Sequence, residues 1–442
     1  MQDEERTQRF NDLAVKFSNY YKGKIMVMPK VPIKSLTDFS YWYTPGIAEV
    51  SRRISKNPDL SFEMTGRWNS IAILTDGTRV LGIGNVGPEA AMPVMEGKSM
   101  IFNFLGGVNA IPIPIRTSSK EEFITVAKAL EPSFGGFNLE DIESPKCFYV
   151  LNELQKELDI PAWHDDQLGT ACIILAGIIN SLRLSGKKIE DSRVVFIGSG
   201  AANIAAANLL INAGFKSGNL ILVDSKGILE PERVDVDSLM INNPWKYELA
   251  LHTNVDRIKG GIKESMKSAD IVVSAAKSDP NTIRPQWITE MNDYPVIFAL
   301  ANPVPEIWPH VAKEGGAKIV ATGRGDFPNQ INNSLVFPGV FRGILDSRSK
   351  GVNFSIMVKA SYEIANFVTD LHEDNIVPKM TDWDLFPKVA SAVAKASSDE
   401  GLARKTGNKE MFYDIAKEII DENRKIYFSL MNDKLIKELP EE

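Results

Sequence analysis

The sequence predicts an α/β protein built on parallel sheets, with a helical section at the end of the chain. Five short apolar segments between residues 193 and 323 alternate with helical or turn patterns, as is typical of a parallel sheet that is covered on both faces. Residues 70–160 show a similar alternation, and the chain from about residue 340 is mostly helical in pattern. We therefore predict three parts: an N-terminal α/β domain at 1–162, a doubly wound parallel-sheet domain at 163–345, and a helical section at 346–442 that packs back on both.

Each element of these parts follows from a local pattern. Asp76-Gly77 is a strong turn signal and predicts a hairpin over residues 70–84. Pro88 predicts the start of a helix that a glycine closes near residue 106. An extended segment at 109–116 and an amphipathic helix at 120–130 follow. The strands of the second sheet are predicted at 193–198, 219–224, 270–276, 295–303 and 318–323.

Composition narrows the class of protein. The 442 residues include 44% hydrophobic and 24% charged residues, which is ordinary for a soluble protein. A net charge of −7 argues against a nucleic-acid partner, and two cysteines are too few for a disulfide framework. The first residues are acidic and polar, unlike a signal peptide, and the apolar run "ACIILAGII" is shorter than a membrane span of about 20 residues. We expect a cytoplasmic protein with no membrane partner.

Two glycine loops are candidates for binding a nucleotide. Gly82 to Gly87 is a full G-x-G-x-x-G, whereas the loop at 198–203 has Asn203 in place of the last glycine. The second loop nevertheless has the required context, because it joins a strand to a helix and the next strand ends in Asp224. We therefore predict a Rossmann-type domain, and a tight turn for the first loop. The predicted cofactor contacts are Gly198, Ser199, Gly200, Ala201, Ala202, Asn203, Asp224, Ser225 and Lys226.

The type of dinucleotide stays open. The carboxylate of Asp224 favours a free 2′-hydroxyl and hence NAD, whereas Ser225 and Lys226 could accept the 2′-phosphate of NADP.

Paired acids at two predicted strand ends suggest a metal site. Glu140 with Asp141 and Asp165 with Asp166 would repel one another unless a cation neutralised them, and oxygen ligands suit Mg²⁺ or Mn²⁺. The alternative is that the acids cap helices. The apolar helix after Gln167 must be buried, so its positive N-terminal end would face the same pocket.

Three other side chains have a chemical and a structural interpretation. Lys98, on an apolar helix, could be a base with a lowered pKa or could extend to the surface. Tyr43 could be a buried acid or part of the core. Arg79 could bind a carboxylate or lie on a strand surface.

These segments together resemble the malic enzymes of the shorter microbial type. The resemblance runs in order from about residue 40 to 346 through "YTPGIAEV", "TDGTRVLGIGNVGPEAAMPVMEGKSMIF", "FGGFNLEDI", "IPAWHDDQLGTA", "VVFIGSGAA", "VIFALANPVPEI" and "ATGRGDFPNQINNSLVFPGVFRG". It implies oxidative decarboxylation of L-malate to pyruvate and CO₂, with NAD or NADP and Mg²⁺ or Mn²⁺ as cofactors. It also implies a homodimer or higher homo-oligomer, to which the aromatic-rich N-terminus could contribute an interface.

The resemblance also implies a role for each site residue. Tyr43 matches the general acid, Lys98 the general base and Asp165 the acid that orients the lysine. The metal ligands would be Glu140, Asp141 and Asp166, and the substrate contacts would be Arg79, Asn302, Asn332 and Asn333, with Asn302 also close to the nicotinamide.

Three positions depart from the family pattern, namely Asn85, Leu168 and Asn203. The alternatives to this function are a malolactic-type or non-decarboxylating 2-hydroxy-acid dehydrogenase and a nucleotide-binding regulatory module without catalysis.

Overall fold

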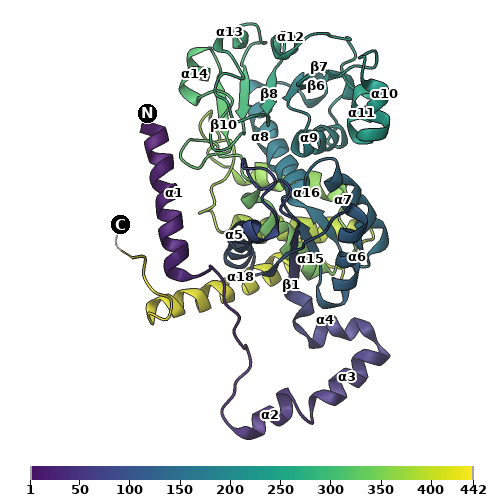
Figure 1. Ribbon diagram of the computed structural model, residues 1–442, viewed down its shortest axis with the longest axis vertical. Coiled ribbons are helices and arrows are strands. Elements are labelled where there is room, and N and C mark those ends of the chain that lie inside the picture. The colour runs from purple at the N-terminus through teal and green to yellow at the C-terminus, as the bar shows by residue number, and fades with distance from the viewer. Residues whose placement is uncertain (1, 441–442) are drawn as a thin grey trace.

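The computed structural model describes residues 2–440 and contains two sheets joined by a shared helical core (Figure 1). The first sheet has the strand order β2-β1-β3-β4, and all of its pairings are parallel. Its strands are β1 (Ser70–Thr75), β2 (Asn109–Pro114), β3 (Phe137–Leu139) and β4 (Ala162–His164). The helices between them are α5 (Pro88–Gly106), α6 (Lys120–Leu130) and α7 (Lys146–Glu157). The predicted domain boundary after residue 162 therefore falls within β4.

The predicted hairpin over residues 70–84 is wrong. β1 pairs in parallel with β2 and β3 on its two sides, so no neighbouring position remains for an antiparallel return strand. Residues 76–87 form the loop between β1 and α5, which turns tightly at its single bridge between Val80 and Gly84. The interpretation of the first glycine loop as a tight turn is thus confirmed.

The second sheet has the order β10-β9-β8-β5-β6-β7 and is parallel except for its short edge strand. All five predicted strands are present where the apolar runs predicted them, and the short edge strand β7 was not predicted. The strands are β5 (Val194–Ile197), β6 (Leu220–Asp224), β7 (Gly227–Ile228), β8 (Ile271–Ser274), β9 (Val296–Ala299) and β10 (Ile319–Thr322). Its helices are α9 (Ala201–Asn212), α10 (Val236–Asn242), α11 (Pro244–His252), α12 (Ile262–Met266), α13 (Pro285–Ile288) and α14 (Pro309–Glu314).

Helix α8 (Thr170–Ser185) joins the two sheets through the centre of the molecule. Its residues from Ala171 to Leu182 are all buried, as its apolar sequence predicted, and it packs against α9 and α16 (Phe354–Phe367). Residues Asp165–Ser185 are long and apolar enough to span a membrane by length and composition, but 78% of that window is buried inside the protein. Burial of this kind is what the central helix of a globular core requires.

The C-terminal helices pack against α5, α8 and one another. They are α15 (Phe337–Ser347), α16, α17 (Leu385–Asp399) and α18 (Lys409–Asn432). Side chains from these helices, from both sheets and from α8 belong to one continuous apolar core, while the opposite face of the second sheet has a smaller core of its own. The helical section thus packs back on the rest of the chain as predicted.

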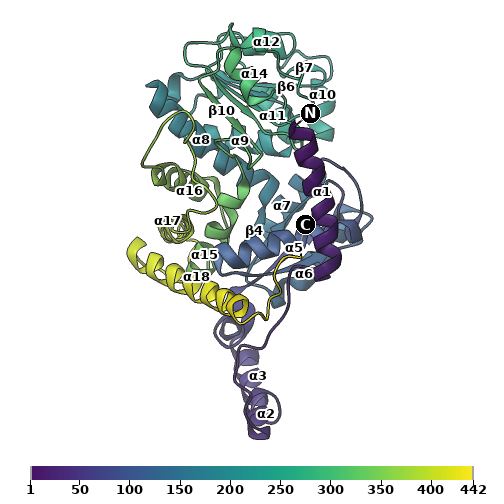
Figure 2. The same ribbon diagram turned by 90° about the vertical axis from the view of Figure 1, so that its left-hand side faces the viewer.

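The N-terminal segment lies outside this core. Helix α1 (Gln2–Tyr21) runs along one side of the molecule, and the Tyr21 hydroxyl donates to the Lys437 carbonyl at 2.9 Å (Figures 1 and 2). Helices α2 (Leu36–Trp42) and α3 (Ile47–Lys56) project from the body, and α4 (Ser61–Met64) leads back to β1 (Figures 1 and 2). We call residues 34–57 the arm.

Candidate active site

The carboxyl edge of the first sheet brings three acids together. Glu140 and Asp141 follow β3, and Asp166 lies just after β4; because β3 and β4 are parallel neighbours, their ends meet at the same edge. One carboxylate oxygen from each of Glu140, Asp141 and Asp166 lies within 4.8 Å of the other two. We call these three residues the acidic cluster.

The surroundings of the acidic cluster suit a cation. Asn138 Nδ2 donates to Glu140 Oε2 at 2.9 Å, and the backbone N–H of Asp141 donates to Asp166 Oδ2 at 3.0 Å. Asp141 Oδ2 is buried without a hydrogen-bond partner among the described residues. A buried carboxylate oxygen left unpaired is costly unless a cation binds it, and an all-oxygen donor set suits Mg²⁺ or Mn²⁺. The residues present therefore fit the predicted metal.

Burial, and to a lesser extent the neighbouring carboxylates, raises the pKa values in the acidic cluster. Burial, together with the charge of Asp166, raises the pKa of Asp141 to about 7. Burial also raises the pKa of Glu140 well above its usual range, although Lys98 opposes this. Both shifts show that the protein alone does not fully compensate the negative charge of the acidic cluster.

Lys98 lies beside the acidic cluster rather than at the surface. Its Nζ lies 2.5 Å from Asp165 Oδ2 and 3.0 Å from Glu140 Oε1, and its side chain is 10% exposed. The expectation of a lowered pKa is wrong for this arrangement: burial lowers the pKa of Lys98, but the charges of Asp165 and Glu140 outweigh it and raise the pKa above its ordinary value. The family resemblance implied Asp165 as a partner of Lys98, but nothing in the sequence indicated Glu140 as a second carboxylate beside the ammonium group.

Asp165 contacts different groups from its neighbour Asp166. Its Oδ2 accepts from Lys98, and its Oδ1 accepts from Trp163 Nε1 at 3.2 Å, so the fully buried side chain does not cap a helix. Residues 165–169 form a single π-helical turn ahead of α8, and within this turn Asp165 contacts Lys98 and Trp163, whereas Asp166 accepts from the Asp141 N–H. The capping interpretation is therefore wrong for Asp165.

A glycine makes room for the Asp165 carboxylate. A Cβ added to Gly169 would lie 2.0 Å from Asp165 Oδ1 and 3.2 Å from Asn333 Cβ. Only glycine fits here without moving the carboxylate. The same distances show that Asn333 lies next to Asp165, as its predicted role in the site requires.

Three residues near the acidic cluster were missed by sequence reasoning. Asn138 and Trp163 orient Glu140 and Asp165 through the hydrogen bonds given above. His164 is fully buried, has no hydrogen-bond partner on either ring nitrogen among the described residues, and its Nδ1 lies 3.8 Å from Asp166 Oδ2. Burial lowers the pKa of His164, so the ring is neutral near pH 7. The sequence did contain a signal for these three residues, because all of them lie on strands that end at the acidic cluster.

The second glycine loop has the geometry of a dinucleotide site. Gly198 has φ of 89°, and a Cβ there would lie 2.7 Å from the Ala275 carbonyl oxygen. Gly200 precedes α9, and the space beside it is open, which leaves the helix N-terminus accessible to a phosphate. The side chain of Asn203 donates to the carbonyls of Ile197 and Gly198 at 2.9 and 2.8 Å. Asn203, although it replaces the last glycine of the usual pattern, therefore links α9 to the end of β5 through two hydrogen bonds.

Asp224 ends β6 as predicted, but it already has several partners. Arg233 donates to both of its oxygens at 2.8 and 3.1 Å, Lys246 pairs with Oδ2, and the backbone N–H of Lys226 donates at 2.8 Å. Burial raises the pKa of Asp224, but these donors outweigh it and hold the pKa below its usual range. Sequence reasoning missed Arg233 and Lys246, which follow Asp224 by 9 and 22 positions. Ser225 and Lys226 are exposed beside this group.

The remaining substrate candidates lie in different positions. The backbone N–H of Arg79 donates to the Asp141 carbonyl at 3.0 Å, and its side chain is exposed. Asn302 is exposed, and its carbonyl would lie 2.9 Å from a Cβ on Gly82, so the first glycine loop contacts the second domain. Asn332 accepts a hydrogen bond from the Ser334 N–H at 2.9 Å and so begins the turn that carries Asn333. Asn302 also lines a cleft of about 460 Å³ between α1 and the loop 323–326.

The two other departures lie near the site without removing a predicted group. Asn85 is exposed in the turn between β1 and α5. Leu168 is 8% exposed and belongs to the main apolar core.

Tyr43 is the one predicted catalytic residue that the chain does not bring to the site. It follows α2 on the arm, and its side chain is 71% exposed. The interpretation of Tyr43 as a core residue is therefore wrong.

A Rossmann-type domain beside a lysine and a carboxylate cluster defines the class of dinucleotide-dependent oxidoreductases. Comparison with known proteins narrows this class. The family model "Malic enzyme, NAD binding domain" matches residues 168–398, and "Malic enzyme, N-terminal domain" matches residues 22–122.

Individual relatives agree with the two family models. The chain is 42% identical to the NAD-dependent malic enzyme of Geobacillus stearothermophilus, over 88% of this chain and 80% of that protein. It is 41% identical to the bifunctional malic/malolactic enzyme of Bacillus subtilis (strain 168), over 92% and 95%. The crystal structure of the Entamoeba histolytica malic enzyme superposes with a TM-score of 0.95 at 39% identity, covering 98% of this chain and 91% of that one. The chain belongs to the malic enzyme family.

Proposed function

We propose that this chain oxidatively decarboxylates L-malate to pyruvate and CO₂ and reduces NAD or NADP, with Mg²⁺ or Mn²⁺ bound by Glu140, Asp141 and Asp166. The observation that supports this proposal best is the contact of Lys98 with Asp165 and Glu140 at the edge of the acidic cluster. It puts a base and a cation site within reach of one hydroxyl group. We further propose that the protein acts in the cytoplasm, which its two buried, free cysteines favour.

Lys98 takes the proton of the malate C2 hydroxyl in this proposal. To do so it must first be neutral, although its two carboxylate partners favour the ammonium form. Glu140 Oε1 cannot serve Lys98 and a cation equally well, and a lysine that loses one carboxylate partner has a lower pKa. Asp165 then orients the amine, since Trp163 and Lys98 fix both of its oxygens.

The bound groups supply the rest of the chemistry: the cation would polarise the C2 oxygen, and the dinucleotide would accept the hydride from C2. Arg79, Asn332 and Asn333 would hold the substrate carboxylates, and Asn302 would contact substrate and nicotinamide. Tyr43 would then protonate C3 of the enolate left by loss of CO₂, and for this step it must be brought to the site from its exposed position on the arm.

A malolactic reaction is the second candidate, because the Bacillus subtilis relative is named as bifunctional. Both reactions use the same substrate and release CO₂, but only the malic reaction leaves reduced dinucleotide in solution. One assay therefore separates them.

The test incubates the purified protein with L-malate and NAD or NADP, with Mn²⁺ or with EDTA, and follows dinucleotide absorbance and CO₂ together. We expect reduced dinucleotide and CO₂ in equal amounts, and only with Mn²⁺. Lys98→Ala should abolish turnover, whereas Lys128→Ala, at an exposed ion pair with Glu157, should not change it. CO₂ without net reduction would favour the malolactic reaction, and full turnover in EDTA would contradict the metal site.

A further inference from the structure

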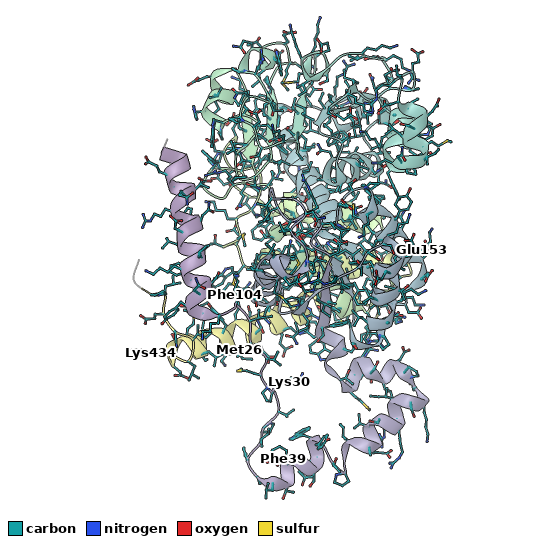
Figure 3. All side chains as sticks on the ribbon, in the orientation of Figure 1. Met26, Lys30, Phe39, Phe104, Glu153 and Lys434 are labelled. Carbon is teal, nitrogen blue, oxygen red and sulfur yellow. The ribbon has the colours of Figure 1, made fainter. Side chains whose placement is uncertain are left out.

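The end of β6 carries a compact group of charged side chains beside the second glycine loop. The backbone N–H of Gly198 donates to the Val223 carbonyl at 2.8 Å, so this loop and the end of β6 lie side by side. Asp224 is the next residue, at the position where a dinucleotide-binding fold places the adenosine ribose. Helices α10 and α11 lie beside this edge of the sheet (Figures 1 and 2), and Figure 3 shows side chains filling the space between them and the strands. Contacts made here distinguish NAD from NADP.

Asp224 has no acceptor position left for a ribose hydroxyl. A carboxylate offers about four acceptor positions, two on each oxygen. Oδ1 accepts from Arg233 Nη1 and from the backbone N–H of Lys226, both at 2.8 Å. Oδ2 accepts from Arg233 Nη2 at 3.1 Å and from Lys246 Nζ. A ribose hydroxyl would have to displace one of these donors, and hydrogen bonds from cations are stronger than those from a neutral hydroxyl.

Arg233 is the residue that keeps Asp224 occupied. A guanidinium group has five N–H donors. Nε donates to Asp235 Oδ1 at 2.6 Å, and the two terminal nitrogens donate to Asp224, to Asp235 Oδ2 at 3.2 Å and to the Gly227 carbonyl at 3.3 Å. Every donor of Arg233 is thus used, and its side chain is 11% exposed. Arg233 therefore fixes two carboxylates and has no donor left for a ligand.

Two lysines beside Asp224 keep unused donors. A lysine ammonium has three N–H donors. Among the described residues, Lys246 Nζ donates to Asp224, and Lys226 Nζ donates to Asp235 at 2.9 Å. The Lys226 side chain is 65% exposed, and the hydroxyl-bearing Ser225 beside it is exposed as well. The groups in contact with one another here are three cations and two carboxylates, so one positive charge is left uncompensated.

We infer that this chain selects NADP, because Arg233 withdraws Asp224 from the ribose while Lys226, Lys246 and Ser225 bind the 2′-phosphate. A phosphate monoester carries about −1.5 to −2 charges near pH 7 and accepts strong hydrogen bonds. It therefore complements a site with a surplus positive charge and unused N–H donors. Asp224 does not repel the phosphate, since two cations compensate its charge. The inference rests on the proposed function, which assigns a dinucleotide as hydride acceptor, and it names which dinucleotide that is.

The test measures binding of adenine nucleotides that differ only in one phosphate. The parent protein is titrated by calorimetry with adenosine 2′,5′-bisphosphate and with AMP. Adenosine 3′,5′-bisphosphate is the control, because it carries the same charge on the neighbouring hydroxyl. We expect the 2′,5′-bisphosphate to bind about tenfold or more tightly than the other two nucleotides. Binding of AMP or of the 3′,5′-bisphosphate as tightly as the 2′,5′-bisphosphate, or binding of none of them, would overturn the inference.

Variants separate the roles within this group. Arg233→Met removes the guanidinium and frees Asp224, so we expect AMP to bind more tightly and the 2′,5′-bisphosphate more weakly than in the parent. Lys226→Gln removes a phosphate ligand but leaves Asp224 occupied, so it should lower affinity for the 2′,5′-bisphosphate about tenfold without changing that for AMP. Lys259→Gln, at an exposed ion pair with Glu232, is the matched control and should change neither affinity.

The outcomes of these titrations decide the inference even if one variant fails. An Arg233→Met protein that keeps the parent's preference would overturn it. If Arg233→Met does not fold, the Lys226→Gln titration decides, and unchanged affinity for the 2′,5′-bisphosphate would overturn the inference. A parent protein that prefers the 2′,5′-bisphosphate but does not oxidise malate would refute the proposed function and support this inference. Malate oxidation with NAD at least as efficient as with NADP would overturn this inference alone.

Discussion

Gly169 offers a sharp test of how the site is held together, because it touches no substrate itself. Its backbone is helical, with φ of −66° and ψ of −46°, so alanine suits the backbone. The side chain is the obstacle, since a Cβ would lie 2.0 Å from Asp165 Oδ1, whereas real Cβ atoms almost never come closer than 3.0 Å. The carboxylate must therefore move by the difference, 3.0 − 2.0 = 1.0 Å or more.

This displacement sets the expected size of the effect. Asp165 holds Lys98 at 2.5 Å and accepts from Trp163 at 3.2 Å, so a shift of this size breaks at least one of the two contacts. A misplacement of about 1 Å in a catalytic group costs about 100-fold in rate. Overpacking costs about 1–3 kcal/mol of stability, partly offset by the preference of a helical position for alanine.

The assay compares kcat for malate and the denaturant midpoint of Gly169→Ala with those of the parent. Gly351→Ala is the matched control, because a Cβ at Gly351 meets nothing within 4 Å. We expect Gly169→Ala to fold and to lose about 100-fold in kcat, with Gly351→Ala unchanged. A folded Gly169→Ala protein with kcat within threefold of the parent's would refute the idea that the position of Asp165 controls Lys98.

Three other predictions concern charge and nucleotide binding. In EDTA, the unfolding temperature should fall as the pH rises from 4 to 7. The reason is that the pKa of Asp141 is raised from 3.8 to about 7 in the folded state. The stability that this carboxyl group contributes is therefore complete below its unfolded pKa and is lost as the pH rises through 7. Asp141→Asn should flatten this slope in a calorimetric scan, and an unchanged slope would contradict the assignment. In the parent, titration calorimetry should show Mn²⁺ affinity rising with pH through about 7, since protons compete for the same carboxylate; an affinity independent of pH would contradict this. Asn203→Ala should weaken dinucleotide binding several-fold in a fluorescence titration and lower the free energy of unfolding by about 1–3 kcal/mol, because the carbonyls of Ile197 and Gly198 lose their hydrogen-bond donor. Unchanged affinity and stability would show that these hydrogen bonds do not support the loop.

Most of the second sheet could be predicted because its strands are short, apolar and buried on both faces. The run that became β5 and the helix after Gly200 carry local patterns that no distant contact overrides. The hairpin predicted at Asp76-Gly77 failed for the opposite reason. Its turn signal was genuine, but β1 takes parallel partners from residues 109 and 137 onward, and such pairings are not encoded near residue 77.

The site was predictable where neighbouring residues share a strand end, and less so where distant segments meet. The acids after β3 and β4 converge because parallel strands end at one edge. The raised pKa of Lys98 depends on carboxylates 42 and 67 positions away, which no local pattern around residue 98 indicates. The sequence could not show that the arm projects from the body, because its exposed apolar residues are of the same types as residues of a core.

We propose that Glu140, Asp141 and Asp166 hold a divalent cation next to Lys98. Anomalous scattering from a crystal soaked in Mn²⁺ locates such a cation. We expect one strong peak in contact with oxygens of all three carboxylates, absent from crystals of Asp141→Asn. A Mn²⁺ peak elsewhere in the protein, with these carboxylates still unbound, would contradict it.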